Sequence, residues 1–199
     1  MRVYGMSGSG NCHKVRMVLE SLKLPYEWTE IDTVRGDTRT AQFLAMNPNG
    51  KAPLLEIEPD NYLPESNAII FYLAEGTPLL PDDRLLRARV LQWLFFEQYS
   101  HEPYIAVARF LRKFHPDPAS QRSLADSRMN GGYRALEVME QQLGRGAFFV
   151  GDRYSIADIA LYAYTHVAHE GGFDLERFPS VRAWLARVRG EPGYVGMPS

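Results

Sequence analysis

The chain has 199 residues, of which 45% are hydrophobic and 23% charged, and a formal net charge of −2. This length suits one domain or two small ones, and the apolar share is sufficient for a buried core. No basic stripe interleaved with aromatic residues accompanies the near-neutral charge, which argues against nucleic acid as a partner.

Cysteine usage and the N-terminal residues indicate the compartment. Cys12 is the single cysteine, which excludes a disulfide framework within the chain and a multi-cysteine metal site. A lone thiol fits a reducing cytoplasm. Residues 1–8 lack the apolar core of a signal peptide, and no apolar run approaches membrane-spanning length. We therefore expect a cytoplasmic protein with no metal site and no membrane partner.

The first 75 residues alternate short strand and helix patterns. The sequence predicts strands at 2–6, 26–32, 53–57 and 62–63, and helices at 13–23, 41–46 and 67–75. In the first helix, Val15, Val18 and Leu19 form one apolar stripe. A loop rich in serine and glycine, residues 7–11, separates the first strand from this helix. The predicted order is therefore β-α-β-α-β-β-α.

Beyond residue 75 only helices are predicted. Residues 76–83 contain Pro78 and Pro81, and this composition indicates an interdomain linker. Helices are predicted at 85–113, at 119–143, from residue 155 and from residue 179. Pro103 should kink or break the first of these. Ser155 and Asp158 have the spacing of a capping box, so we assign Asp158 to folding and not to catalysis.

Residues 47–75 carry the strongest functional signal. Residues 47–50 (Asn-Pro-Asn-Gly) form a turn, and the Ala52-Pro53 bond after it is a candidate cis bond at the start of a strand. Ser66 can cap the next helix. An exposed backbone beside a proline and a capped helix N-terminus can bind a small peptide and its carboxylate. Each piece alone is common in turns and caps, but their order and spacing favour a ligand site.

This arrangement resembles the bacterial-type glutathione S-transferase superfamily. Residues 151–159 (Gly-Asp-Arg-Tyr-Ser-Ile-Ala-Asp-Ile) are similar to the motif that caps the buried helix of the family's all-α domain. The resemblance extends from the first strand to Trp184. It implies an α/β plus all-α fold: a thioredoxin-like domain at 1–75, a linker at 76–83 and a helical-bundle domain at 84–199. It also implies a homodimer that uses glutathione as co-substrate, without a metal or an organic cofactor.

The resemblance also assigns glutathione-binding residues. Ala52, which precedes Pro53, corresponds to the residue whose backbone pairs with the cysteinyl part of glutathione. Glu65 corresponds to the acceptor for the α-amino group, and Ser66 to the residue that holds the γ-glutamyl carboxylate. Lys51 can reach the glycyl carboxylate.

Activation of the glutathione thiol requires a donor near the sulfur. A free thiol has a pKa of about 8.5, and lowering it by about two units takes about 2.7 kcal/mol of preferential thiolate stabilisation. A hydroxyl in the loop after the first strand, with the positive end of the first helix, can supply this. Ser9 is the leading candidate by resemblance, and Asn11 is a second donor. Tyr4 is an alternative, Ser7 is a weaker one, and Cys12 is expected to be a buried, inert thiol.

The electrophile site is expected between the two domains. Tyr104, Arg109 and Phe110 are candidate walls, together with Tyr194 or Met197. The implied function is conjugation of the glutathione thiolate to a small hydrophobic electrophile. Two alternatives stay open: a glutathione-dependent disulfide reductase or peroxidase, and a non-catalytic interaction module with this fold. The intact glutathione-binding motifs disfavour the module.

Overall fold

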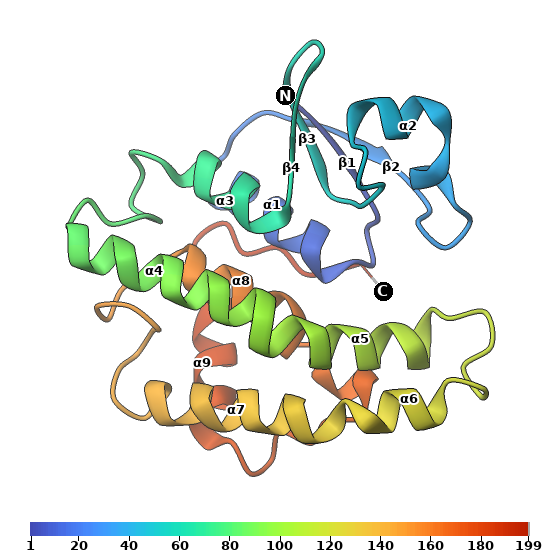
Figure 1. Cartoon of the computed structure of the whole chain (residues 1–199). Helices are drawn as coiled ribbons and strands as arrows, with labels where there is room; N and C mark the ends of the chain where they lie inside the picture. Colours follow the sequence, from blue (N-terminus) through green and yellow to red (C-terminus); the bar gives the residue numbers. More distant parts are fainter. Residues whose placement is uncertain (199) are drawn as a thin grey trace. The chain divides into compact units, whose positions relative to one another are not determined.

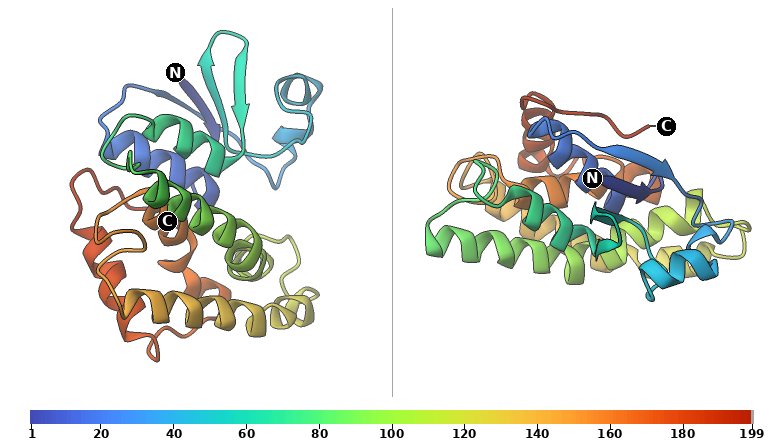
Figure 2. Two further views of the ribbon diagram at one scale, coloured as in Figure 1. Left: turned by 60° about the vertical axis from the view of Figure 1, so that its left-hand side comes forward. Right: turned by 90° about the horizontal axis from the view of Figure 1, so that it is seen from above.

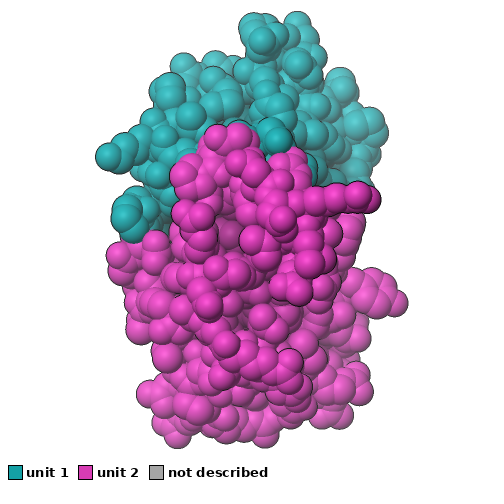
Figure 3. All heavy atoms as spheres, turned by 90° about the vertical axis from the view of Figure 1, so that its left-hand side faces the viewer, with its two compact units in different colours: residues 1–75, 192–199 teal, residues 76–191 magenta. Residues whose placement is uncertain are grey.

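The computed structural model describes residues 1–198, and the chain divides into two compact units (Figure 3). Unit 1 contains residues 1–75 and the tail that begins at Pro192. Unit 2 contains residues 76–191, so the segment predicted as a linker belongs to it. Ser199, the last residue of the predicted all-α domain, lies outside the described residues.

Unit 1 contains a mixed four-stranded sheet with the strand order β2-β1-β3-β4 (Figure 1). β1 (Arg2–Gly5) runs parallel to β2 (Glu27–Glu30) and antiparallel to β3 (Leu54–Glu58). β3 pairs antiparallel with β4 (Asn61–Pro64). A parallel pair needs a crossover connection, and α1 (Gly10–Ser21) provides it between β1 and β2. The predicted thioredoxin-like order of strands and helices is confirmed.

The two faces of this sheet are covered by different helices. α1 and α3 (Ser66–Ala74) lie side by side on one face (Figures 1 and 2). α2 (Ala41–Met46) covers the other face, where Phe43 packs with Ile31 and Leu54. A short 3-10 turn at Asp37–Arg39 precedes α2. Each face of the sheet therefore has its own apolar layer.

Unit 2 is helical. Its helices are α4 (Arg84–Phe96), α5 (Glu102–Lys113), α6 (Arg122–Ser127), α7 (Met129–Leu143), α8 (Ile156–Thr165) and α9 (Pro179–Arg189), with a 3-10 turn at Ala168–Gly171. Every residue of α8 is buried. The capping box of Ser155 and Asp158 is present at its start, which confirms that prediction. Within residues 1–198 no helix is long and apolar enough to cross a membrane.

Both long predicted helices are interrupted. Between α4 and α5 the chain forms a π-helical segment, Glu97–His101, and Pro103 lies in the first turn of α5. Proline lacks the N–H that a continuous helix would require, so the predicted break is confirmed. The second helix is divided at Arg128 into α6 and α7. There Gly131 allows a close approach, since a Cβ on it would lie 2.2 Å from ring atoms of Tyr104.

Candidate functional site

Strand register brings the predicted glutathione-binding segments to one edge of the sheet in unit 1. Leu54 lies opposite Tyr4 of β1 and opposite Pro64 of β4. Because both pairs are antiparallel, the end of β1, the start of β3 and the end of β4 meet at this edge. The loop after β1, the Ala52-Pro53 bond before β3 and the start of α3 therefore converge, although the sequence separates them by about fifty residues.

The Ala52-Pro53 peptide bond is cis, as the sequence predicts. Pro53 is buried and Ala52 is half-buried. The preceding turn is fixed by Asn47, whose Nδ2 donates to the Lys51 carbonyl oxygen over 2.8 Å. The Lys51 side chain is exposed. The backbone of Ala52 is therefore held at the entrance of β3, and Lys51 extends into solvent beside it.

Glu65 has an unusual backbone conformation at the start of α3. Its φ is 73° and its ψ is 112°. A non-glycine residue at positive φ is conformationally costly, and such positions concentrate at ligand sites. The Glu65 side chain is exposed and does not cap α3. Its carboxylate therefore projects at the sheet edge, directly after Pro64.

A chain of hydrogen bonds joins α1 to the start of α3. Lys14 is fully buried, with 0% of its surface exposed. Its Nζ lies 3.4 Å from Ser66 Oγ and 3.4 Å from Asn67 Oδ1. Ser66 Oγ in turn donates to Asn11 Oδ1 over 3.2 Å. Thus the structure brings Asn11 and Ser66 into direct contact, whereas sequence analysis assigned Asn11 to the thiol of glutathione and Ser66 to its γ-glutamyl carboxylate.

Lys14 and Asn67 are the participants that sequence analysis missed. Lys14 precedes Val18 by one helical turn, so its place beside the apolar stripe of α1 was the available signal. A lysine there usually extends its ammonium to solvent, and only the tertiary structure reveals the buried partner groups.

Electrostatics at this edge favour an anion. Neither α1 nor α3 has an acidic residue in its first turn, although Glu65 precedes α3 directly, and the positive ends of both helix dipoles lie at this edge. The buried Lys14 side chain lies between the two helices. No group of three His, Cys, Asp or Glu side chains among the described residues is arranged to hold a metal ion. The edge therefore suits a ligand that carries carboxylate or thiolate charge.

Ser9 precedes α1 in an extended conformation, but its hydroxyl does not cap the helix. The hydroxyl forms a hydrogen bond with the Cys12 thiol. Cys12 is fully buried, and this burial raises the pKa of its thiol to about 11. Cys12 is therefore inert at neutral pH, as expected.

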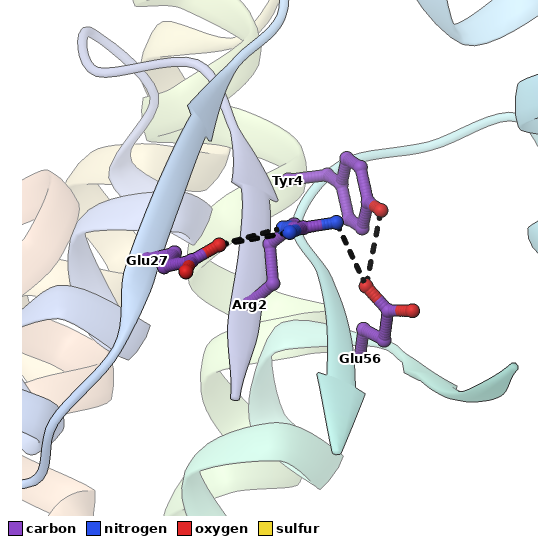
Figure 4. Close-up of polar contacts among 4 residues, drawn as sticks. All are labelled: Arg2, Tyr4, Glu27 and Glu56. Atoms are coloured by element: carbon purple, nitrogen blue, oxygen red, sulfur yellow. Dashed lines mark hydrogen bonds and ion pairs between the residues drawn. The ribbon is translucent and has the colours of Figure 1, made fainter. Parts of the chain in front are cut away.

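The two alternative donors are occupied elsewhere. The Ser7 hydroxyl donates to Glu30 Oε2 over 2.6 Å. Tyr4 packs with the α2-side cluster, and its hydroxyl donates to Glu56 Oε2 over 3.1 Å. Figure 4 shows this contact together with Arg2, whose guanidinium lies 2.8 Å from Glu27 and 3.6 Å from Glu56. Tyr4 therefore belongs to a polar cluster of the sheet, whereas Ser9 and Asn11 lie at the start of α1, where the resemblance places the thiol donor.

The three candidate electrophile-site residues all lie in α5 of unit 2, but they do not share a face. At about 100° per residue, Arg109 and Phe110 point about 140° and about 120° away from Tyr104, to opposite sides of it. Arg109 is buried, and its Nε lies 2.5 Å from Glu170 Oε2. Phe110 is 42% exposed, and Tyr104 packs against Gly131. Arg109 thus forms a buried ion pair within unit 2, and the assignment of Tyr104, Arg109 and Phe110 to an electrophile site stays a prediction.

Comparison with known proteins identifies the class. The family described as glutathione S-transferase, N-terminal domain, matches residues 1–75, and the corresponding C-terminal domain matches residues 95–192. A crystal structure of a glutathione S-transferase from Pseudomonas fluorescens is 55% identical, with a TM-score of 0.96 over 100% of this chain and 98% of that one.

Two further relatives bear on chemistry. The disulfide-bond oxidoreductase YfcG of Escherichia coli is 30% identical over 92% of this chain and 87% of its own length. A glutathione transferase from Burkholderia graminis, solved with two glutathione molecules bound per subunit, is 30% identical with a TM-score of 0.83 over 96% of this chain and 84% of that one. The chain belongs to the glutathione S-transferase family.

Proposed function

We propose that this protein is a cytoplasmic, homodimeric glutathione transferase that conjugates the glutathione thiolate to a small hydrophobic electrophile. No metal or organic cofactor is needed for this reaction. The observation that carries the proposal is the convergence of Ser9, Asn11, Ala52, Glu65 and Ser66 at one edge of the sheet. The glutathione-bound Burkholderia graminis relative supports the choice of ligand.

The peptide would be held mainly by backbone and carboxylate groups. The backbone of Ala52, beside the cis bond, would pair with the cysteinyl residue of glutathione. Glu65 would accept from the α-amino group, and the positive end of α3 would hold the γ-glutamyl carboxylate. Lys51 is exposed and would reach the glycyl carboxylate. This orientation directs the thiol towards the start of α1.

The protein would activate the bound thiol by stabilising its anion. Ser9 and Asn11 supply donors, and the end of α1 supplies positive potential. A hydrogen bond to a charged group contributes about 1.5–3 kcal/mol, which is close to the requirement for a two-unit pKa shift. The thiolate sulfur then forms a bond to the electrophilic carbon, and the leaving group departs with the displaced electron pair. The remaining rate advantage comes from proximity.

A second candidate, glutathione-dependent disulfide reduction, is supported by the similarity to YfcG and by the relative with two bound glutathione molecules. In this reaction one glutathione thiolate attacks a substrate disulfide and releases a thiolate. A second glutathione thiolate then attacks the mixed disulfide, which produces glutathione disulfide and the second substrate thiol. Because Cys12 is buried and protonated, both thiols in this cycle would come from glutathione.

Calorimetry with glutathione and paired activity assays test the proposal. An activated aryl chloride reports conjugation, and a low-molecular-weight disulfide reports reduction. We expect glutathione binding and faster turnover of the chloride. Turnover of the disulfide alone would replace the first candidate by the second, and absence of glutathione binding would contradict both. Cys12→Ala should leave either activity unchanged.

A further inference from the structure

A tight turn at residues 6–9 connects the end of β1 to the start of α1. The Ser9 amide closes this turn by donating to the Met6 carbonyl oxygen over 2.9 Å. The Ser9 carbonyl oxygen accepts from the His13 amide in α1, also over 2.9 Å. Ser7 occupies the second position of the turn. The place of Ser9 at the start of α1 therefore depends on how the residues before it are held.

Glu30, the last residue of β2, holds this turn through Ser7. Its Oε1 accepts from the Ser7 amide over 2.7 Å, and its Oε2 accepts from the Ser7 hydroxyl over 2.6 Å. The parallel register pairs Glu30 with Gly5, the last residue of β1, so the carboxylate lies directly beside the turn. Both oxygens of one carboxylate thus contact one residue. A two-point contact of this kind fixes the orientation of Ser7 as well as its position.

Two further side chains hold the Glu30 carboxylate in place. Trp28 Nε1 donates to its Oε2 over 2.7 Å. The Arg16 guanidinium lies 4.1 Å from the centroid of the Trp28 ring and donates to Ser7 Oγ over 3.2 Å. Partial burial raises the pKa of the Glu30 carboxyl, but the hydrogen bonds from Ser7 and Trp28 outweigh this effect, so the pKa is lower than usual. Because an ionised carboxylate only accepts and a guanidinium only donates, the Ser7 hydroxyl gives its proton to Glu30.

The negative charge of Glu30 by itself opposes thiol activation at the start of α1. A carboxylate near a thiol disfavours the thiolate and so raises the thiol pKa. Glu30 acts in this direction on the Cys12 thiol, where burial is the main cause of the raised pKa. By holding the turn that carries Ser9, the same carboxylate would instead favour a bound thiolate. The electrostatic and the geometric effects of Glu30 on the thiol pKa therefore have opposite signs.

We propose that Glu30 is a positioning residue for thiol activation: its carboxylate holds the turn at residues 6–9 so that the Ser9 hydroxyl faces the sulfur of bound glutathione. This inference rests on the proposed function. A donor is effective only when it is held within about 0.5 Å of its productive position. The contact between Glu30 and Ser7 supplies this restraint two residues before the donor.

The test compares the thiol pKa of bound glutathione with the affinity for S-methylglutathione, which has no ionisable thiol. Glu30→Ala should raise the thiol pKa by about one unit towards its free value of about 8.5, while the affinity for S-methylglutathione changes less than about threefold. Loss of a negative charge alone would lower the thiol pKa. Glu27→Ala is the matched control, because it removes the carboxylate at the other end of β2, which contacts Arg2. It should leave the thiol pKa in place.

A double-mutant cycle shows whether Glu30 acts through Ser9. In a Ser9→Ala background, Glu30→Ala should cause no further rise in the thiol pKa. If Glu30→Ala is unfolded, Glu30→Gln takes its place, since the NH₂ group of glutamine cannot accept from the Ser7 hydroxyl or from Trp28. A thiol pKa that falls or stays in place in the single variant, additive rises in the double variant, or a loss of S-methylglutathione affinity would each overturn the inference.

A ligand-free measurement separates this inference from the proposed function. The hydrogen-exchange rate of the Ser9 amide reports on the hydrogen bond to Met6 that closes the turn. We expect Glu30→Ala to raise this rate about tenfold or more and Glu27→Ala to leave it unchanged. If wild-type protein does not bind glutathione, the proposed function fails, yet this result still decides whether Glu30 holds the turn. An unchanged rate in Glu30→Ala contradicts the positioning role itself.

Discussion

Glu65 combines a strained backbone with an exposed carboxylate. Its φ of 73° belongs to the region that favours glycine, but glutamate occupies it. Strain of this kind costs about 1–3 kcal/mol and persists where the surrounding structure holds it. The side chain makes no capping hydrogen bond that would offset this cost. The proposed ligand-binding role of the carboxylate would explain why glutamate occupies this position.

Substitution at Glu65 should separate stability from affinity. Glu65→Gly relieves the backbone and should raise the free energy of unfolding by about 1 kcal/mol. Both Glu65→Gly and Glu65→Ala should weaken glutathione binding about tenfold or more, because the α-amino group loses a charged acceptor. Calorimetry and urea titration measure the two effects. Glu58→Ala, at an exposed position, is the control, and an unchanged affinity in Glu65→Ala would place the ligand elsewhere.

His166 should make the stability of unit 2 depend on pH. Burial lowers the pKa of its imidazole to about 4, and the nearby Arg109 and Arg189 guanidinium groups add to this effect. Its Nδ1 lies 2.9 Å from the Tyr162 carbonyl oxygen, to which it donates, and its ring stacks on the Tyr162 ring. Glu170 opposes the shift. The neutral ring is therefore the form that the folded protein accommodates.

The direction in which stability changes with pH follows from proton uptake on unfolding. Because the pKa is lower in the folded state, the unfolded state binds more protons between about pH 6.5 and pH 4. The stabilisation is present above pH 6.5 and is lost as the pH falls through that window, by up to about 3 kcal/mol. Unfolding of wild type and His166→Gln by urea across pH 4–7 measures it, with His169→Gln as control. Parallel profiles for wild type and His166→Gln would show that His166 contributes nothing.

At the scale of the elements, the tail that begins at Pro192 packs against the end of α1 through Gly193. Gly193 has a φ of 77°, and a Cβ on it would lie 2.6 Å from Ser21 Cα at the end of α1. The obstacle is backbone, so it cannot rotate away. We expect Gly193→Ala to detach the tail, and hydrogen exchange of residues 194–198 should then become fast.

Gly196→Ala is the matched control for the tail. Among residues 1–198, a Cβ on Gly196 would meet only the Tyr194 hydroxyl, at 4.0 Å. In Gly196→Ala, the hydrogen-exchange rates of residues 194–198 should match those of wild type. Equal protection of the tail in both variants would show that Gly193 does not anchor it.

Sequence patterns predicted the order of elements better than their boundaries. Proline, glycine and the capping box gave local signals for the break at Pro103 and for the start of α8. α1 begins at Gly10, three residues before the predicted start, because the first turn of a helix tolerates residues without strong helix propensity. The sequence analysis missed the division at Arg128, although Gly131 and Gly132 just after it are a local signal of a weakened helix.

Prediction of the site residues was limited in the same way: local motifs could be recognised in the sequence, but tertiary contacts could not. Ala52, Pro53, Glu65 and Ser66 occur within one recognisable motif, and strand register places them at one edge. Lys14 was missed, because its role depends on contacts across fifty residues that periodicity does not report. Sequence patterns likewise gave no signal for the ion pair that Arg109 forms with Glu170. Only tertiary packing reveals such partners.

At the scale of the whole molecule, the exposed aromatic side chains of unit 2 require an explanation. Phe95 and Tyr99, one helical turn apart, are 70% and 84% exposed, and Leu85 on α4 is 59% exposed. Tyr72 on α3 is 48% exposed. Exposed apolar surface of this kind typically marks an interface. We therefore expect a two-fold homodimer in solution.

Light scattering tests this assembly. Wild type should show twice the chain mass of 22.7 kDa at micromolar concentration. Phe95→Glu should shift the protein to a monomer, because a charge would be buried in the interface. Val138→Glu, at another exposed apolar position on α7, should leave the dimer intact. A wild-type protein that remains monomeric contradicts the prediction.

The central claim is that the start of α1 activates the thiol of bound glutathione, and its thiolate absorbance across pH measures this directly. Wild-type protein should titrate about two units below the free value of about 8.5. Ser9→Ala should raise the thiol pKa most, Asn11→Ala should raise it less, and Tyr4→Phe should leave it in place, because the Tyr4 hydroxyl donates to Glu56. A rise in Tyr4→Phe with no change in the other two variants, or a bound thiol that titrates at its free value in wild type, would contradict the claim.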